Sequence, residues 1–203
     1  MLLDRLGPDA PTLCAGWSTA DLAAHVVIRE HNPLDAMAVV LGDRAGPLRP
    51  RAARACAREL RRPWNEIVER LRGGPPPGPL AIPGLRESLN LHEFVVHHED
   101  VRRANGLTPR EDVPELQDAV WRVVTRWARF AVRGLPRGLG VELARPGGGD
   151  HVVPRRGTPT VRATGQPVEL MLWIWGRVDD ADVQFDGASE ADRGAVRAAR
   201  VPL

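Results

Sequence analysis

Hydrophobic residues recur at the three- and four-residue spacing of amphipathic helices along the first two thirds of the chain, between Pro and Gly positions. Ser18 and Asp21 form a capping-box pattern, a hydroxyl residue followed three positions later by an acid, where one of these helices begins. A stiff segment rich in Pro and Gly, residues 73–79, forms a linker between helices. The pattern predicts helices over residues 1–6, 18–33, 34–41, 51–71 (kinked at Pro63), 86–105 and 113–133.

After Pro136 the pattern changes to short alternating segments. These segments predict strands over residues 141–144, 151–153, 160–163 and 183–185, with a hairpin turn at residues 147–150. A short helix over residues 167–177 and a terminal helix capped by Ser189 and Asp192 complete the pattern. The predicted fold is mainly α, with a helical domain over residues 1–136 followed by a small α+β domain over residues 137–203.

Composition excludes several classes of function. The 203-residue chain contains no Lys and no Tyr, so it offers no Schiff-base lysine and no phosphate-loop lysine. Its net charge is +2, and the densest basic stretch, residues 49–62, has no aromatic residue for stacking on bases, so no nucleic-acid partner is expected. Apolar runs such as residues 170–175 are far shorter than the roughly 20 residues that span a bilayer, so no membrane partner is expected. Two Cys without a secretory signal predict a cytoplasmic protein, as a monomer or homodimer.

The helix predicted over residues 86–105 carries two polar side chains on its apolar face. Glu93 and His97 lie four residues apart and therefore point to the same side as Leu89, Val101 and Ala104. Burying a carboxylate and an imidazole without compensation costs several kcal/mol. A divalent metal supplies such compensation, because both groups are metal ligands.

His25 is the natural third ligand, because it lies on the core-facing side of its own helix. A set of two His and one Glu leaves a fourth position for water, thiol or substrate, as in catalytic zinc sites. Asp100, three residues after His97, is placed to accept a hydrogen bond from that imidazole. Cys14 lies in the loop before the helix of His25 and either approaches this site or packs as a small hydrophobic residue, which is the interpretation that we favour.

Two simpler interpretations stay open at this point. Glu93 and His97 form an ordinary surface pair if the buried face is rotated by one residue, or the three side chains form a metal-free polar cluster. Cys56 is expected to pack within its helix. The remaining histidines are expected to face solvent: His31, His92, His98 and His151.

Two segments carry a resemblance to a known family. Residues 14–25, CAGWSTADLAAH, resemble the pattern C-x-G-W-[ST]-x-x-D-L-x-x-H, and residues 93–100, EFVVHHED, resemble E-x-V-V-H-x-x-D. Both patterns are typical of the DinB-like superfamily, specifically the metal-binding domain of mycothiol-dependent maleylpyruvate isomerases. The resemblance covers the helical part, and the tail is similar to the accessory C-terminal domain of these proteins.

The resemblance implies a four-helix bundle that holds a divalent metal through His25, Glu93 and His97. Zinc is the first expectation, with nickel or another transition metal as alternatives. It also implies a low-molecular-weight thiol such as mycothiol and an electrophilic small-molecule substrate, in an isomerase or S-transferase reaction. A metal-binding, stress-related or partner-binding protein without turnover is the alternative. The chain departs from the family in its first helix, which is expected to be truncated to residues 1–6.

Overall fold

The computed structural model describes residues 1–31, 46, 49–76, 85–110 and 113–201 of the chain. The helix expected over residues 34–41 and the end of the expected linker lie outside these residues. The chain divides into two compact units, Met1–Pro109 and Arg110–Pro202, each with its own packing. The fold is mainly helical with a small C-terminal sheet, as the sequence predicts.

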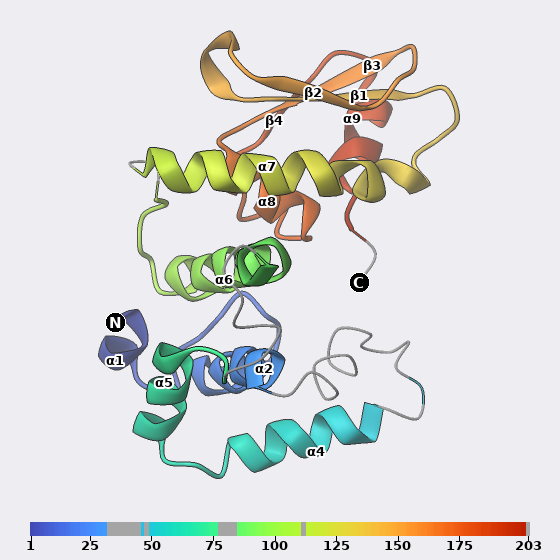
Figure 1. The fold of residues 1–203 in the computed structure, drawn as a ribbon. Coiled ribbons are helices and arrows are strands. Elements are labelled where there is room, and N and C mark those ends of the chain that lie inside the picture. Colours follow the sequence, from blue (N-terminus) through green and yellow to red (C-terminus); the bar gives the residue numbers. More distant parts are fainter. Residues whose placement is uncertain (32–45, 47–48, 77–84, 111–112, 202–203) are drawn as a thin grey trace. The chain divides into compact units, whose positions relative to one another are not determined.

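The first unit is entirely helical in its described residues (Figure 1). Helix α2 packs against α4, α5 and α6, and the short α1 packs against α5. Pro63 separates α4 from α5, where the sequence predicts a kink in one helix. A core of Leu3, aliphatic residues of α2 and α5, and Val101 of α6 holds these elements together. The helices are α1 (Leu2–Leu6), α2 (Thr19–His31), α4 (Arg49–Glu59), α5 (Trp64–Gly73) and α6 (Leu85–Ala104).

The start of α2 is fixed by the predicted capping box. The backbone N–H of Ser18 donates to the carboxylate of Asp21 at 3.0 Å, and the N–H of Asp21 lies 3.3 Å from the Ser18 hydroxyl oxygen. The loop before α2 is tied to α6, because the backbone N–H of Leu13 donates to the carbonyl of Asp100 at 3.2 Å. These bonds set where both α2 and the loop lie against α6.

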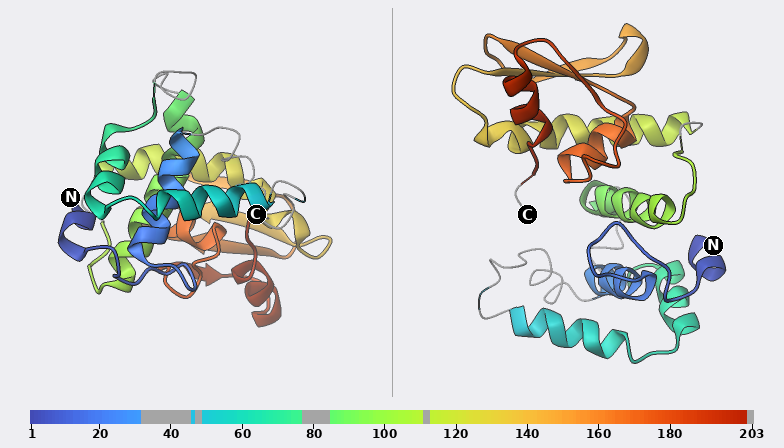
Figure 2. Two further views of the ribbon diagram at one scale, coloured as in Figure 1. Left: turned by 90° about the horizontal axis from the view of Figure 1, so that it is seen from below. Right: turned by 180° about the vertical axis from the view of Figure 1, so that it is seen from behind.

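The second unit contains a four-stranded sheet in the order β2-β1-β3-β4. Strand β1 is antiparallel to β2 and parallel to β3, and β3 is antiparallel to β4. Helices α7, α8 and α9 lie on one side of this sheet (Figures 1 and 2). Its elements are α7 (Pro114–Ala131), the 3-10 turn η3 (Val132–Gly134), β1 (Gly140–Ala144), η4 (Pro146–Gly148), β2 (His151–Arg155), β3 (Thr160–Thr164), α8 (Pro167–Ile174), β4 (Gln184–Asp186) and α9 (Glu190–Arg197).

Helix α7 belongs to the second unit, whereas the sequence-based boundary at residue 136 assigns it to the helical domain. The buried stripe of α7, which includes Val120 and Val124, packs against α8 and β2. Gln117 joins α7 to the start of α8, because its side-chain oxygen accepts the backbone N–H of Val168 at 3.1 Å. The boundary between the two units therefore lies between residues 109 and 110, before α7 and not after it.

Among the described residues, every helix is either too short or too polar to cross a membrane.

Candidate metal centre

The structure brings His25, Glu93 and His97 together at the contact between α2 and α6, two helices that lie side by side (Figures 1 and 2). One ligand atom from each side chain lies within 4.8 Å of the other two. Oxygen Oε2 of Glu93 is 3.4 Å from Nε2 of His25 and 3.4 Å from Nε2 of His97. The carboxylate oxygen thus stands between the two imidazoles.

These two distances fit a shared metal ion. Nitrogen and oxygen ligands bind zinc at about 2.0–2.1 Å, so two ligands of a tetrahedral ion lie roughly 3.3 Å apart. A direct N–H···O hydrogen bond is shorter, about 2.9 Å. The 3.4 Å separations at Glu93 Oε2 are long for hydrogen bonds and close to the edges of such a tetrahedron.

The other oxygen of Glu93 is held by different residues. Oε1 lies 3.1 Å from the Arg29 guanidinium and 3.3 Å from Nε2 of His92. Arg29 is one turn after His25 on α2, so the same two helices supply this contact. Glu93 is thus oriented to present Oε2 alone to the two candidate histidine ligands.

The expectation that His92 faces solvent is wrong. Its side chain is only 12% exposed and reaches the carboxylate of its sequence neighbour Glu93. Helical spacing gives only the direction of the Cα–Cβ bond and not where the end of a long side chain lies. His98 is 38% exposed, as expected.

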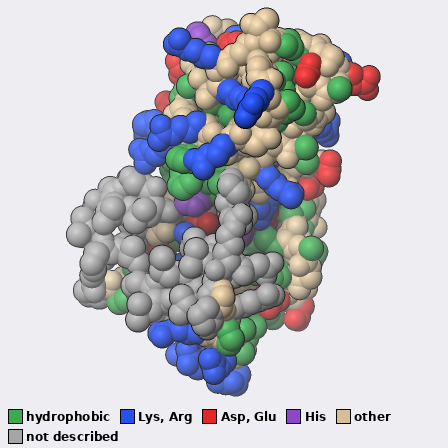
Figure 3. Space-filling view, turned by 90° about the vertical axis from the view of Figure 1, so that its right-hand side faces the viewer, with side chains coloured by type: hydrophobic (Ala, Val, Ile, Leu, Met, Phe, Trp, Pro, Cys, Tyr) green, Lys and Arg blue, Asp and Glu red, His purple; other side chains and the backbone are tan. Residues whose placement is uncertain are grey.

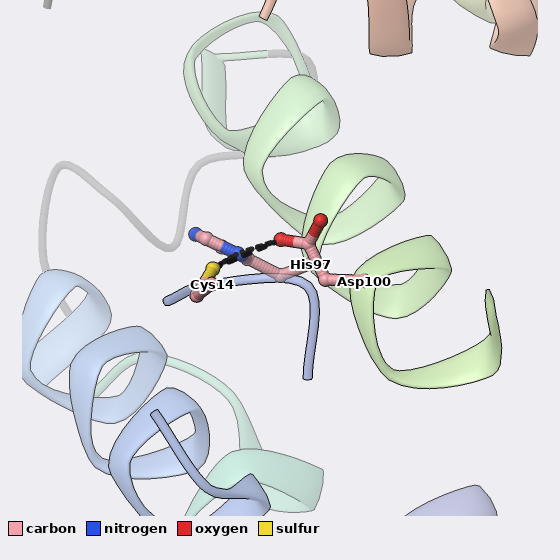
Figure 4. A group of neighbouring side chains, drawn as sticks. All are labelled: Cys14, His97 and Asp100. Atoms are coloured by element: carbon pink, nitrogen blue, oxygen red, sulfur yellow. Dashed lines mark hydrogen bonds and ion pairs between the residues drawn. The ribbon is translucent and has the colours of Figure 1, made fainter. Parts of the chain in front are cut away.

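The second nitrogen of His97 faces away from Glu93 and toward Asp100 (Figure 4). Nδ1 of His97 is 2.9 Å from Oδ2 of Asp100, a side chain with no exposed surface. Such a hydrogen bond fixes the tautomer of a metal-ligating histidine, with Nε2 left for the ion. The structure thus gives Asp100 the geometry of the predicted acceptor.

Cys14 also belongs to this group. Its thiol donates to the same Asp100 oxygen at 3.2 Å and lies 3.9 Å from Nδ1 of His97 (Figure 4). The favoured sequence interpretation of Cys14, a small packing residue, misses this contact. The contact between Cys14 and Asp100 depends on the path of the loop before α2. The path of a loop leaves no periodic pattern in the sequence.

Cys14, His97 and Asp100 are themselves close enough to form a second candidate ligand group. Their separations, however, are those of hydrogen bonds: 2.9 Å between Nδ1 and Oδ2 is shorter than the roughly 3.3 Å edge of a tetrahedral zinc site. Cys14 and Asp100 therefore contact His97 by hydrogen bonds, and the group with Glu93 is the candidate ligand set whose distances fit an ion better.

The protonation states of the three candidate ligands differ. Burial lowers the pKa of His25, so its imidazole is neutral and able to bind a metal. Burial alone raises the pKa of Glu93, but hydrogen bonds from three histidines and the charge of Arg29 hold it far below its usual range. Burial also opposes the charged form of His97, yet the hydrogen bond to Asp100 raises its pKa well above the usual value. A metal at Nε2 of His97 would compete with the proton that this raised pKa favours.

The group is close to the surface but largely covered. The side chains of His25, Glu93 and His97 are 11–13% exposed. The Trp17 ring packs on His25 with the two ring centroids 5.1 Å apart, and 37% of Trp17 is exposed. Figure 3 shows one face of the molecule, on which histidine and acidic side chains lie close to residues that the structure does not describe.

The remaining chemically active residues lie elsewhere. His151 on β2 is exposed, as predicted. His31, predicted to face solvent, is half-buried, and its Nδ1 is 3.0 Å from the carbonyl of Val27 in its own helix. Cys56 is half-buried on α4. None of these three belongs to either of the ligand groups formed by the described residues.

Comparison with models of known families, with curated proteins and with solved structures found no match to the chain.

Proposed function

We propose that this protein binds a divalent metal through His25, Glu93 and His97, with zinc as the first choice and nickel or another transition metal as alternatives. The observation that carries the proposal is the position of Glu93 Oε2, 3.4 Å from a nitrogen of each histidine. Three protein ligands leave a fourth position open, which is the arrangement of catalytic rather than structural zinc. When bound, such an ion makes a thiol or water nucleophilic at neutral pH by lowering its pKa.

The surrounding residues of the chain have separate tasks in this proposal. Arg29 and His92 hold Glu93 Oε1, so that the carboxylate binds through one oxygen. Asp100 keeps the proton of His97 on Nδ1. Arg29 and a divalent ion would together carry more positive charge than Glu93 and Asp100 carry negative charge. The loaded site would therefore favour an anionic ligand at the open position.

The kind of ligand follows from the resemblance of residues 14–25 and 93–100 to mycothiol-dependent isomerases. We propose a low-molecular-weight thiol of that class, which attacks an electrophilic small molecule in an isomerase or S-transferase reaction. The packing of α2 against α4, α5 and α6 supports the four-helix bundle of the DinB-like superfamily as the scaffold. A metal-binding protein without turnover is the competing function.

Metal analysis of the purified chain tests the first step. After reconstitution with zinc, we expect about one ion per chain in the wild type and none that survives gel filtration in His97→Ala. His98→Ala is the matched control, because His98 is the next residue on α6 and belongs to neither ligand group of the described residues. Equal metal content in the two variants would refute the assignment.

Cobalt substitution tests the second step. A thiolate that binds Co²⁺ gives an intense sulfur-to-metal charge-transfer band, so titration with a small thiol should produce this band in the wild type. Bound cobalt with an unchanged spectrum would exclude thiol chemistry and favour the protein without turnover.

A further inference from the structure

Asn90 lies on α6, three residues before Glu93 and seven residues before His97. Residues at these spacings point to the same side of an α-helix, about one and two turns apart. Asn90 therefore belongs to the same face as the two α6 ligands, one turn closer to the N-terminus of the helix.

The side chain of Asn90 is buried, with 6% of the residue exposed. Within the described part of the chain, its amide nitrogen Nδ2 has no hydrogen-bond acceptor. Asn105, at the other end of α6, differs: its Nδ2 donates to the carbonyls of Pro11 at 2.9 Å and Val101 at 2.7 Å. A buried N–H without an acceptor is destabilising and uncommon in folded proteins. The described residues thus give no partner for the amide N–H at position 90.

On the basis of the proposed function, we propose that Asn90 is a specificity-determining residue for the small-molecule ligand of this site. Its amide N–H donates to a carboxylate oxygen of the ligand, one helical turn from the group that faces Glu93 and His97. The positive charge expected at the loaded site favours a carboxylate over a neutral carbonyl.

The spacing also sets the size of the ligand. The Cβ atoms of residues three positions apart on a helix are about 5–6 Å apart. A thiol whose carboxylate is two carbons from its sulfur spans such a distance. The inference therefore predicts that the site prefers short thiols with a carboxylate to thiols of equal length without one.

The test compares two probes, 3-mercaptopropionate and 1-propanethiol, on the cobalt-loaded full chain. The wild type should bind mercaptopropionate about tenfold or more tightly than propanethiol, as expected for a hydrogen bond to a charged acceptor. Asn90→Leu should remove this preference and change the affinity for propanethiol by less than about twofold. Asn90→Asp should bind mercaptopropionate more weakly than Asn90→Leu does, because two carboxylates then repel each other.

Thermal unfolding of the metal-free variants gives a readout that does not depend on the ion. Asn90→Leu should leave the midpoint of thermal unfolding unchanged or raise it, since Nδ2 of Asn90 has no hydrogen bond to lose among the described residues. Asn105→Leu is the matched control. It should lower the midpoint of thermal unfolding, because both hydrogen bonds of Asn105 Nδ2 are lost.

The outcomes separate the inference from the proposed function. Failure of the wild type to bind cobalt, or to give a charge-transfer band with either thiol, overturns the proposed function and the inference with it. Bound thiols whose affinities are the same in Asn90→Leu and wild type overturn the inference alone. A midpoint lowered by Asn90→Leu as much as by Asn105→Leu also overturns it, since the amide then has a structural acceptor.

Discussion

Replacement of Asp100 by Asn tests how much the hydrogen bond behind His97 contributes to metal binding. The substitution keeps the size of the side chain and leaves one oxygen that can accept from Nδ1 of His97, but it removes the negative charge. Asp100 has no exposed surface, so little solvent screens that charge. We expect weaker metal binding with the three ligands still in place.

The magnitude follows from the geometry. A hydrogen bond to a charged group contributes about 1.5–3 kcal/mol, against about 0.5–1.5 kcal/mol for a neutral one. The loss of about 1–2 kcal/mol corresponds to roughly 5- to 30-fold weaker binding, since each 1.4 kcal/mol is tenfold. Asp100→Ala removes the acceptor altogether and should cost up to about 100-fold.

Competition with a zinc-binding dye measures the dissociation constants, and Glu99→Gln is the control. Glu99 is the neighbouring residue and is equally buried, but its carboxylate pairs with Arg102 and Arg103 rather than with the site. Glu99→Gln should therefore lower the free energy of unfolding and leave the zinc affinity within about twofold of wild type.

The pH dependence of stability gives a second readout. The folded-state pKa of His97 is raised, so its ion pair with Asp100 stabilises the metal-free protein fully below the unfolded pKa of about 6.5. This contribution is lost as the pH rises through the raised pKa. The difference in stability between wild type and Asp100→Asn should therefore be larger at about pH 6 than at about pH 9. Unchanged zinc affinity in Asp100→Asn, or a difference in stability that grows with pH, would refute the reasoning.

Two further predictions concern the site, and a third concerns the cap of α9. His92→Ala should weaken zinc binding by about tenfold or less, because Arg29 still holds Glu93. The dye competition measures this affinity, and loss of stoichiometric binding would instead make His92 a ligand. Zinc binding should release about one proton near neutral pH, which calorimetry in buffers of different ionisation enthalpy detects. The zinc affinity should rise with pH until the pH passes the raised pKa of His97. Ser189→Ala removes the capping box of α9 and should cost about 1 kcal/mol in thermal unfolding without any change in zinc affinity; a cost near zero would mean that α9 does not depend on its cap.

The sequence predicts those features of the site that depend on helical periodicity. The i,i+4 spacing of Glu93 and His97 and the capping box at Ser18 fix two helix faces, and these faces meet in the structure. Periodicity also places Asp100 one turn beyond His97. The same reasoning predicts the strands and the hairpin of the second unit.

Other features of the site depend on contacts that periodicity does not encode. Cys14 reaches Asp100 because a backbone hydrogen bond ties the loop before α2 to α6, and His92 contacts its sequence neighbour Glu93. The assignment of α7 to the second unit likewise depends on which partner covers its apolar stripe. An amphipathic helix shows in its sequence that one face is buried, but not against what.

The hydrogen bond from the Leu13 backbone to the Asp100 carbonyl, together with the Cys14 thiol on the Asp100 side chain, links the loop before α2 to the support of His97. If the site binds a metal as proposed, we expect occupancy of the site and ordering of this loop to be thermodynamically coupled. Metal loading should slow the exchange of the Leu13 amide hydrogen with solvent deuterium, and a chelator should restore its speed. The N-terminal segment would then act as a local sensor of whether the protein is loaded.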